Sequence, residues 1–452
     1  MVPQNFLPLE YAQTQGVIFL FGGINMKRNL IRELKELMGK VVKVEGYVHK
    51  IRVLKYITFI VVRDRSGLVQ CVAENSSINL KNLKLESVVS IVGEVKESKN
   101  SLNPFEISIN KVEIISEVKE ELPIEINKEN LTVNLDTMLD NRVLSLRNEK
   151  KQAIFKVQNI IVESFREFLA NREFTEIFTP KIVAEGAEGG TEVFEVKYFE
   201  NKAYLAQSPQ FYKQMMVSVF ERVFEVGQVY RAEEHNTNRH LNEYVSMDLE
   251  FGYIEDENDL MELEEELLKY IFTNLKVKGE KYFDLLNVEA PVLNYKIPKI
   301  KLSDAIKILK EKFNKKLAGD LDPEGEKLIC NYVKKTYGSE FVFLTHYPRK
   351  KRPMYTMPYG EKETHSFDLL YRGIEITTGG QRINDYDMLI ENMKYKGLNP
   401  EDYSSYTEVF KYGMPKHGGL AIGLERITAK VLGLANVREA ALFTRDRNRI
   451  RP

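Results

Sequence analysis

The chain of 452 residues has no tryptophan and only two cysteines, Cys71 and Cys330. Two cysteines so far apart exclude a disulfide framework, and they are too few for a cysteine zinc site. A surplus of charge is missing as well, because 65 Lys and Arg residues stand against 66 Asp and Glu residues. The chain as a whole is therefore not a polybasic nucleic-acid binder, and any nucleic-acid site has to be a local basic patch.

Long apolar segments are also missing. None reaches the roughly 18 residues that a membrane-spanning helix needs. Residues 1–25 contain GVIFLFGGI but no Lys or Arg, so they lack the basic start of a signal peptide. We expect them to be a disordered or adventitious extension before Met26, and the protein to be cytoplasmic. With 43% apolar residues, the rest of the chain is long enough to bury more than one core.

Residues 40–116 are rich in short strand-like segments, such as KVVKVEGYVHKI and PFEISINKVEII, with Gly turns between them. This spacing predicts a small five-stranded barrel. Over residues 40–70, seven Lys or Arg residues outnumber two acidic residues, and aromatic side chains are interleaved with them. Basic groups bind phosphates and aromatic faces stack on unpaired bases, so the pattern is typical of an OB-fold nucleic-acid surface. The alternative is an ordinary barrel with a solvated basic face.

Residues 117–147 carry a helix-breaking proline in ELPIEI and are otherwise mostly polar, so we interpret them as a hinge or linker. The segment AIFKVQNIIVESFREFLANR then has apolar residues at helical spacing. Strands alternate with helices from there on, which predicts one large α+β domain over residues 148–452. Within it, the charged decapeptide RAEEHNTNRH (231–240) separates two strand-like segments, RVFEVGQVY and EYVSMDLEFGY. A strand, a charged loop and a second strand are expected there.

Four further segments are suited to ligand binding: AEGAEGGTEVF (184–194), QSPQFYKQ (207–214), FDLLYRGIEITTGGQRI (367–383) and HGGLAIGLERI (417–427). None is a Walker A loop or a Rossmann fingerprint. Together they offer arginines for phosphate oxygens, carboxylates for Mg²⁺ and glycines that let the backbone approach a ligand. Each segment alone also fits an ordinary turn or a surface ion pair.

In chain order, FTEIFTP, YRAEEHNTNRHLNEYVSMDLEF and GGLAIGLERITAKVLGLANVREAALFTRDRNRIRP resemble the three signature motifs of class II aminoacyl-tRNA synthetases. The resemblance covers residues 26–452 and is similar in detail to aspartyl-tRNA synthetases of the compact archaeal and eukaryotic type. It implies an OB-fold anticodon domain over residues 26–116 and a catalytic domain with an antiparallel six-stranded sheet flanked by helices. It also implies a homodimer with Pro180 at the subunit interface.

The resemblance implies a two-step activity. Aspartate attacks the α-phosphate of ATP, giving aspartyl-adenylate and pyrophosphate, and the aspartyl group then moves to the terminal ribose of tRNA(Asp). His49 and Leu102 stand where enzymes restricted to that tRNA often have Trp and Lys, so tRNA(Asn) is a second expected substrate. Three alternatives stay open: an asparaginyl-tRNA synthetase, an aspartate-activating paralogue that no longer charges tRNA, and a non-catalytic nucleic-acid-binding protein on this scaffold.

For ATP, the resemblance implies Arg231, Glu233, Arg239, His240, Leu241, Tyr244, Glu375, Gly423, Leu424, Glu425 and Arg426 as binding residues. Arg231 and Arg426 are the expected catalytic residues, because in-line attack at phosphorus needs alignment and charge neutralisation more than a general base. Asp368, Glu375 and Thr378 are expected to hold Mg²⁺.

For aspartate, the resemblance implies Glu188, Gln210, Lys213, Arg231, Thr378 and Arg382 as binding residues. Lys213 and Arg382 decide the amino acid, because a site for aspartate has to neutralise a second carboxylate and a site for asparagine does not. Asparaginyl-tRNA synthetases typically lack the lysine of QSPQ-x-x-K. In the barrel, His49, Arg52, Phe59 and Gln70 are expected to contact the tRNA anticodon.

Overall fold

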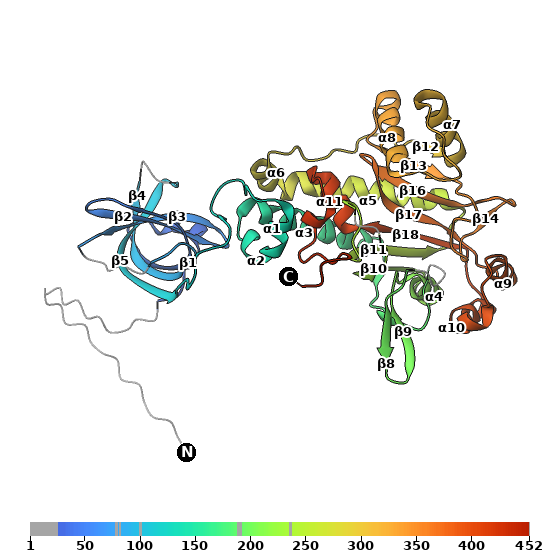
Figure 1. The fold of residues 1–452 in the computed structure, drawn as a ribbon, viewed down its shortest axis with the longest axis horizontal. Helices are drawn as coiled ribbons and strands as arrows, with labels where there is room; N and C mark the ends of the chain where they lie inside the picture. The colour runs from blue at the N-terminus through green and yellow to red at the C-terminus, as the bar shows by residue number, and fades with distance from the viewer. Residues whose placement is uncertain are drawn as a thin grey trace, which may run out of the picture. The chain divides into compact units, whose positions relative to one another are not determined.

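The computed structural model describes residues 26–76, 80, 83–98, 102–187, 192–234 and 237–451 (Figure 1). The extension expected at residues 1–25 and the Glu188 side chain lie outside these residues. The chain separates into two compact units, Met1–Pro123 and Ile124–Pro452, and the division falls inside the segment that we interpret as a linker. Across the described part of the chain, each helix is too short or too polar to cross a membrane.

The first unit is a closed barrel of five strands in the order β1-β2-β3-β5-β4. Its strands alternate between interior and surface: in β1, Val42 and Val44 are buried, whereas Lys43 and Glu45 are partly exposed. A barrel whose interior is filled by side chains requires this alternation. The expected five-stranded barrel is therefore confirmed. Its elements are the 3-10 helix η1 (Ile31–Leu37), β1 (Val41–Val53), β2 (Ile57–Asp64), β3 (Gly67–Glu74), β4 (Val88–Glu97) and β5 (Phe105–Ser116).

The second unit is built on an eight-stranded sheet in the order β12-β13-β16-β17-β18-β11-β10-β6. The six strands from β13 to β10 are antiparallel, and the short edge strands β12 and β6 pair in parallel. The expected antiparallel six-stranded sheet is confirmed, and one short strand extends it at each edge. The bounds are β6 (Thr175–Glu176), β10 (Arg222–Tyr230), β11 (Glu243–Gly252), β12 (Lys299–Lys301), β13 (Phe341–Thr345), β16 (Ser366–Tyr371), β17 (Ile374–Arg382) and β18 (His417–Gly423).

Helices α3 (Glu149–Ala170), α5 (Glu257–Lys278) and α11 (Leu424–Leu432) share the main hydrophobic core with one face of this sheet (Figure 1). The amphipathic pattern of residues 153–172 forms α3 as expected, and its apolar side chains Val157 and Phe165 are fully buried in that core. Burial of a side chain of this size contributes about 2 kcal/mol. The helices are thus fixed to the sheet by packing rather than by helix propensity alone.

Strand β11 separates the main core from the opposite face of the sheet. Met247 and Leu249 pack into the core, so the alternating residues Asp248 and Glu250 point to the other face. Both carboxylates are buried, and buried carboxylates need cationic partners. Helix α4 (Gln210–Phe220), which packs against β10 and β11, faces them.

Helices α7 (Leu302–Phe313) and α8 (Pro323–Tyr337) pack at the β12–β13 end of the sheet around a second core (Figure 1). The start of α8 is fixed by Asp322, whose Oδ1 accepts the Gly325 N–H at 2.7 Å, and by Pro323 in the first turn. The remaining elements are α1 (Leu135–Asp140), α2 (Arg142–Ser145), β7 (Ile182–Val183), β8 (Glu195–Tyr198), β9 (Asn201–Leu205), α6 (Glu280–Leu286), β14 (Pro358–Tyr359), β15 (Glu363–Thr364), α9 (Tyr386–Tyr395), η2 (Pro400–Tyr403), α10 (Ser404–Thr407), η3 (Glu408–Tyr412) and η4 (Val437–Ala440).

Candidate active site

A cavity of about 620 Å³ opens on the face of the main sheet to which Asp248 points. Its lining side chains come from segments between residues 207 and 437, so folding joins positions that are far apart in the sequence. Most of the expected site residues line it: Gln210, Lys213, Arg231, Glu233, Arg239, His240, Leu241, Tyr244, Glu375, Thr378, Arg382, Gly423, Glu425 and Arg426. Two lie elsewhere. Leu424 packs into the main core, and Asp368 lines an adjoining cavity of about 170 Å³.

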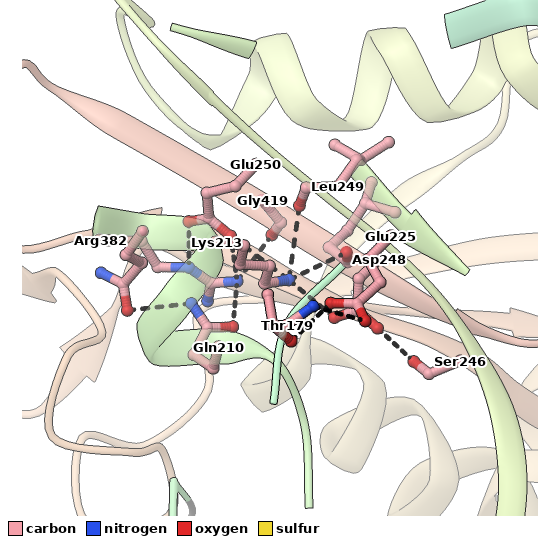
Figure 2. Close-up of polar contacts among 12 residues, drawn as sticks. Thr179, Gln210, Lys213, Glu225, Ser246, Asp248, Leu249, Glu250, Arg382 and Gly419 are labelled. Carbon is pink, nitrogen blue, oxygen red and sulfur yellow. Dashed lines mark hydrogen bonds and ion pairs between the residues drawn. The ribbon is translucent and has the colours of Figure 1, made fainter. Parts of the chain in front are cut away.

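Lys213 is buried in this site between two carboxylates (Figure 2). Its Nζ lies 3.0 Å from Asp248 Oδ1 and 3.3 Å from Glu250 Oε2. It also donates to the main-chain carbonyls of Leu249 and Leu420 at 3.4 and 3.3 Å. The side chain is only 1% exposed, so Lys213 is a fixed cation of the site and not a solvated helix residue.

Arg382 lies beside Lys213 and shares Glu250 with it. Its Nε donates to Glu250 Oε1 at 2.9 Å, and its Nη2 donates to the Gly419 carbonyl at 3.0 Å and to Gln210 Oε1 at 3.3 Å (Figure 2). Burial alone would raise the pKa of Glu250, but Arg382 and Lys213 outweigh it and bring the pKa below its ordinary value. The site therefore holds a cluster of two cations and two anions.

The two anions of this cluster, Asp248 and Glu250, are functional candidates that the motif comparison does not single out. They lie within the second motif, in which the resemblance assigns roles to the arginines and the histidine but not to these two carboxylates. The signal that marks them is the apolar-polar alternation of SMDLE. A strand that alternates buried apolar and acidic residues places its carboxylates together on one face.

A row of buried hydrogen bonds fixes the amide of Gln210. Its Nε2 donates to Gln214 Oε1 at 3.0 Å, and the Tyr406 hydroxyl donates to the same oxygen at 3.1 Å. Gln214 Nε2 lies 3.0 Å from His417 Nε2. Because an amide nitrogen only donates, His417 accepts there and donates through Nδ1 to the Pro415 carbonyl at 2.9 Å. Burial lowers the pKa of His417, which agrees with a neutral ring.

The expected strand, charged loop and strand are confirmed, and the loop carries Arg231 and Glu233 to the cavity. Asn242 ties the two sides of the loop together. Its Nδ2 donates to the Arg231 and Glu233 carbonyls at 2.7 and 2.9 Å, and its own carbonyl accepts the Arg231 N–H at 2.9 Å. Tyr244, the cross-strand partner of Val229, lines the cavity beside them, and burial raises the pKa of its hydroxyl.

Another part of the cavity gathers Arg239, Arg426 and Glu375. Arg426 Nη1 donates to the Glu375 carbonyl at 3.1 Å and to its Oε1 at 3.3 Å, and Thr378 Oγ1 donates to the same Oε1 at 3.2 Å. Burial would raise the pKa of Glu375, but the surrounding arginines, Arg426 foremost, lower it. Arg239 Nη2 donates to Glu326 Oε1 at 2.9 Å. Glu326 belongs to α8, outside the three motifs.

Glu375 and Thr378 present oxygen atoms that suit Mg²⁺. Among the described residues, no group of three or more His, Cys, Asp or Glu side chains is arranged to hold a metal ion. Mg²⁺ commonly takes one or two carboxylates and completes its shell with water and phosphate oxygens, so these two residues fit an ion that arrives with a nucleotide. Asp368 is engaged differently: Arg352 Nη2 donates to its Oδ1 at 2.7 Å, and burial raises the pKa of Asp368 to about 6.

In the barrel unit, the residues expected at the anticodon share one surface. Phe59 pairs with Arg52 on one side and Val72 on the other, and Val61 pairs with Gln70. Cross-strand partners point to the same side of a sheet, as do residues two apart on one strand. Arg52, Phe59 and Gln70 therefore lie on the outer face of β1, β2 and β3.

His49 lies at a bulge in β1, between Val48 and Lys50. Arg63 Nη1 lies 3.0 Å from His49 Nδ1, and Arg63 Nη2 donates to Glu86 Oε2 at 2.8 Å. Because a guanidinium only donates, Nδ1 of His49 accepts and the ring proton is on Nε2. Burial and the charge of Arg63 lower the pKa of His49, which favours this neutral form.

Two family models match the two units of the chain. One, described as tRNA synthetases class II (D, K and N), matches residues 134–447, and the other, an OB-fold nucleic acid binding domain, matches residues 42–115. This chain belongs to the class II tRNA synthetases. The synthetase class and the OB-fold expected from the motifs are thus confirmed, whereas the roles of single residues stay predictions.

The synthetase is 50% identical over 435 residues to an aspartate–tRNA(Asp/Asn) ligase of Deinococcus radiodurans, which covers 94% of this chain and 99% of the relative. It is 43% identical over 429 residues to an aspartate–tRNA(Asp) ligase of Pyrococcus abyssi, covering 92% and 98%. A solved asparaginyl-tRNA synthetase from Pyrococcus horikoshii, complexed with asparaginyl-adenylate, matches with a TM-score of 0.85 and 30% identity, covering 94% and 100%.

Proposed function

We propose that the synthetase activates L-aspartate with ATP and transfers the aspartyl group to tRNA(Asp), and to tRNA(Asn) as a second substrate. The observation that carries the amino acid is the buried pair of cations Lys213 and Arg382. Both line the cavity, and strand carboxylates hold both in place before a substrate arrives. A site preorganised in this way binds the side-chain carboxylate of aspartate with little further loss of conformational freedom.

Asparagine is the weaker candidate for electrostatic reasons. Its neutral amide offers no charge to compensate for the water that a substrate displaces from Lys213 and Arg382, whereas a carboxylate does. The two relatives with the higher identities carry aspartate in their names, and the asparaginyl-tRNA synthetase shares the fold at lower identity. The electrostatic argument and the sequence identities both favour aspartate over asparagine as the amino-acid substrate.

The first step brings the aspartate α-carboxylate to the α-phosphate of ATP. Arg231, at the end of β10, suits a bidentate contact that spans both groups, and Arg426 offsets the charge of the outer phosphates. Glu233 accepts from the adenine amino group while Tyr244 stacks on the ring. Asn242 ties down the loop that carries Arg231 and Glu233. Tyr244 lies on β11 and Arg426 lies on α11. Because these side chains are held in place, they can align the carboxylate for attack without a general base. Pyrophosphate leaves in this step. A hydroxyl of the terminal ribose of the tRNA then attacks the aspartyl carbonyl, and AMP leaves as the anhydride bond breaks.

Glu375 and Thr378 would hold Mg²⁺ against the phosphates, where the ion offsets their negative charge. Asp368 remains a third predicted ligand, although its carboxylate already accepts from Arg352. The chain's own contribution is to keep Glu375 ionised: the arginines around it hold its pKa low despite burial. A carboxylate in that state is the form that binds a divalent cation.

A homodimer is the assembly we propose for the synthetase. In the first motif, Phe178 is 82% exposed and Ile182 is 48% exposed. Thr179, next to them in the chain, donates to Glu225 at 2.7 Å (Figure 2). Lys181 donates to the same carboxylate at 2.6 Å. This anchored segment presents two large apolar side chains outward, and a second copy of the chain would remove them from water.

The second tRNA is proposed from His49 and the exposed Leu102. The anticodons of tRNA(Asp) and tRNA(Asn) differ only in the third base, cytosine or uracil, and both bases carry an O2 acceptor. A neutral His49 with its proton on Nε2 donates to an acceptor that the two bases share. Leu102 supplies no cation that would favour one of them.

ATP–pyrophosphate exchange with aspartate and with asparagine, followed by charging of both purified tRNAs, tests the proposed function. Exchange with asparagine alone would overturn the amino-acid assignment. Exchange with aspartate but no charging of either tRNA would identify the non-charging paralogue, and no exchange at all would favour the non-catalytic alternative. Charging of tRNA(Asp) alone would remove the second substrate. The cytoplasmic location stays a prediction.

A further inference from the structure

Glu326 is a buried acidic residue that lies outside the three motifs and pairs with Arg239. It lies in the first turn of α8, whose start is fixed by the Asp322 cap and by Pro323. Helix α8 belongs to the segment between β12 and β13, far in sequence from the rest of the site. A carboxylate on a capped helix start has a well-defined position, which suits it to orient a mobile partner.

Both carboxyl oxygens of Glu326 are used, and each reaches a different part of the site. Oε1 accepts from Arg239 Nη2 at 2.9 Å, and Oε2 accepts the backbone N–H of Glu375 at 3.3 Å. Glu326 thus connects the charged loop after β10 to the start of β17, two segments that would meet at the polyphosphate. Burial raises the pKa of Glu326, while Arg239 acts in the opposite direction.

The contact with Glu326 uses one nitrogen of the Arg239 guanidinium. Nη2 is the atom engaged, and the Arg239 Nε, which is buried, has no hydrogen-bond partner among the described residues. A buried donor without a partner is costly, and its pairing with a ligand oxygen recovers that cost. Arg239 also lines the main cavity, so its side chain is within reach of a polyphosphate bound there.

We propose that Glu326 is a positioning residue for ATP: it holds Arg239 by one nitrogen so that the rest of the guanidinium faces the outer phosphates. The inference rests on the proposed function only in that ATP is the ligand. It assigns no contact between Glu326 and the nucleotide, because a carboxylate and a polyphosphate repel one another unless a cation lies between them. Arg239 is that cation.

The test measures the affinity of the full-length chain for α,β-methylene-ATP and for AMP by titration calorimetry. Glu326→Gln keeps the shape but removes the charge, and it should weaken the ATP analogue about tenfold, as expected for the loss of one charge-assisted contact. AMP affinity should change less than about twofold, because AMP lacks the phosphates that Arg239 would meet. Glu326→Asp, which keeps the charge on a shorter side chain, should give an intermediate loss. A structural defect would weaken both ligands alike.

Two controls complete the test. Glu324→Gln removes a carboxylate from the same helical turn that pairs with Lys315 at the surface, and it should leave both affinities unchanged. In an Arg239→Ala background, Glu326→Gln should add no further loss, because a residue that acts through Arg239 has nothing left to position. Additive losses, equal losses for the two nucleotides, or unchanged or tighter binding of the ATP analogue would each overturn the proposal.

The outcome is separable from that of the proposed function, because neither nucleotide titration involves an amino acid. If the wild-type chain binds the ATP analogue but aspartate drives no exchange, the proposed amino acid is wrong and the inference about Glu326 still stands. If aspartate drives exchange while Glu326→Gln leaves the affinity for the analogue unchanged, the inference fails alone. In ATP–pyrophosphate exchange, Glu326→Gln should raise the Michaelis constant for ATP and leave the Michaelis constant for aspartate unchanged.

Discussion

Glu264 of α5 is a carboxyl group buried in the second unit without a counter-charge. It is 0% exposed, and no cationic side chain among the described residues offsets its charge. Burial raises the pKa of Glu264 to about 8, with Thr377 acting against the rise and the Asp368 carboxylate adding to it. In the unfolded chain the same group ionises near its ordinary value of 4.5. The folded state therefore holds a proton that the unfolded state has released.

The sign of the resulting pH dependence follows directly. Between pH 4.5 and about 8, the folded state binds more protons than the unfolded state, so the free energy of unfolding falls as pH rises through this window. Each pH unit is worth about 1.4 kcal/mol. The penalty from Glu264 is thus roughly 1 kcal/mol at about pH 5.5 and roughly 4 to 5 kcal/mol at about pH 8.5.

Glu264→Gln removes this titration while keeping the shape of the side chain. Relative to the wild type, the variant should gain about 3 kcal/mol more stability at about pH 8.5 than at about pH 5.5. The pH-independent cost of the buried amide cancels in that difference. Urea unfolding followed by the helical circular dichroism signal reports on the second unit, because the described α-helices lie there. A stability difference that is the same at both pH values would refute the reasoning.

The adjacent Glu265 is the matched control. Its carboxylate accepts the Ile297 N–H at 2.9 Å and pairs with Lys269 at 2.6 Å. Burial would raise the pKa of Glu265, but these partners lower it below its ordinary value. Glu265→Gln should therefore destabilise the chain by a similar amount at both pH values, since the group stays ionised throughout. A pH-dependent effect of Glu265→Gln would show that the unfolding assay itself responds to pH.

Three further predictions concern the site, the dimer and the tRNA. Lys213→Met should lower kcat/KM for aspartate in pyrophosphate exchange at least about 100-fold, because Asp248 and Glu250 lose a buried partner; near-normal exchange would contradict the assignment. Phe178→Asp should shift the chain toward the monomer in sedimentation analysis, whereas the same change at another exposed aromatic residue, Tyr337→Asp, should not. His49→Trp should reduce charging of tRNA(Asn) more than charging of tRNA(Asp), with exchange unchanged; equal losses for both tRNAs would remove His49 from the choice of base.

Much of the architecture can be predicted from local sequence, because the spacing of apolar residues along a segment indicates whether it forms a strand or a helix. Alternation such as that of Val42 and Val44 indicates a barrel strand, and the apolar spacing around Phe165 indicates the long helix α3. The edge strands β6 and β12 are two and three residues long. Segments so short carry no period, so their addition to the sheet cannot be seen before the chain is folded.

The side-chain partners of the site are less accessible to sequence reasoning. Arg382 and Glu250 are 132 residues apart and meet only because β17, β18 and β11 are neighbours in the sheet. Motif resemblance finds Arg382, since it stands in the distinctive segment GIEITTGGQR. It does not find Glu326, whose helix begins with PEGEK, a sequence that reads as an ordinary charged surface. Only the fold shows that this glutamate faces inward.

Three consecutive glutamates in α5 show why composition alone cannot predict whether a glutamate is buried or ionised. Glu264 is fully buried and holds its proton to about pH 8. Glu265 is buried and ionised beside Lys269, and Glu266 lies at the surface, where it pairs with Arg172 at 2.9 Å. Their helix propensities are identical. Their chemical states differ because successive residues on a helix point about 100° apart, toward the core, its edge and the solvent.

The same reasoning explains how the substrate site keeps two cations out of water. Lys213 and Arg382 are at most 5% exposed, and an isolated charge buried so deeply would lose several kcal/mol of hydration. Asp248 and Glu250 remove that loss, so the cluster is close to neutral before aspartate binds. Discrimination against asparagine therefore does not need a surplus of positive charge over the whole cluster. We expect it to come from the two fixed cations locally: a carboxylate can accept from both where they line the cavity, whereas a neutral amide offers one oxygen and no charge.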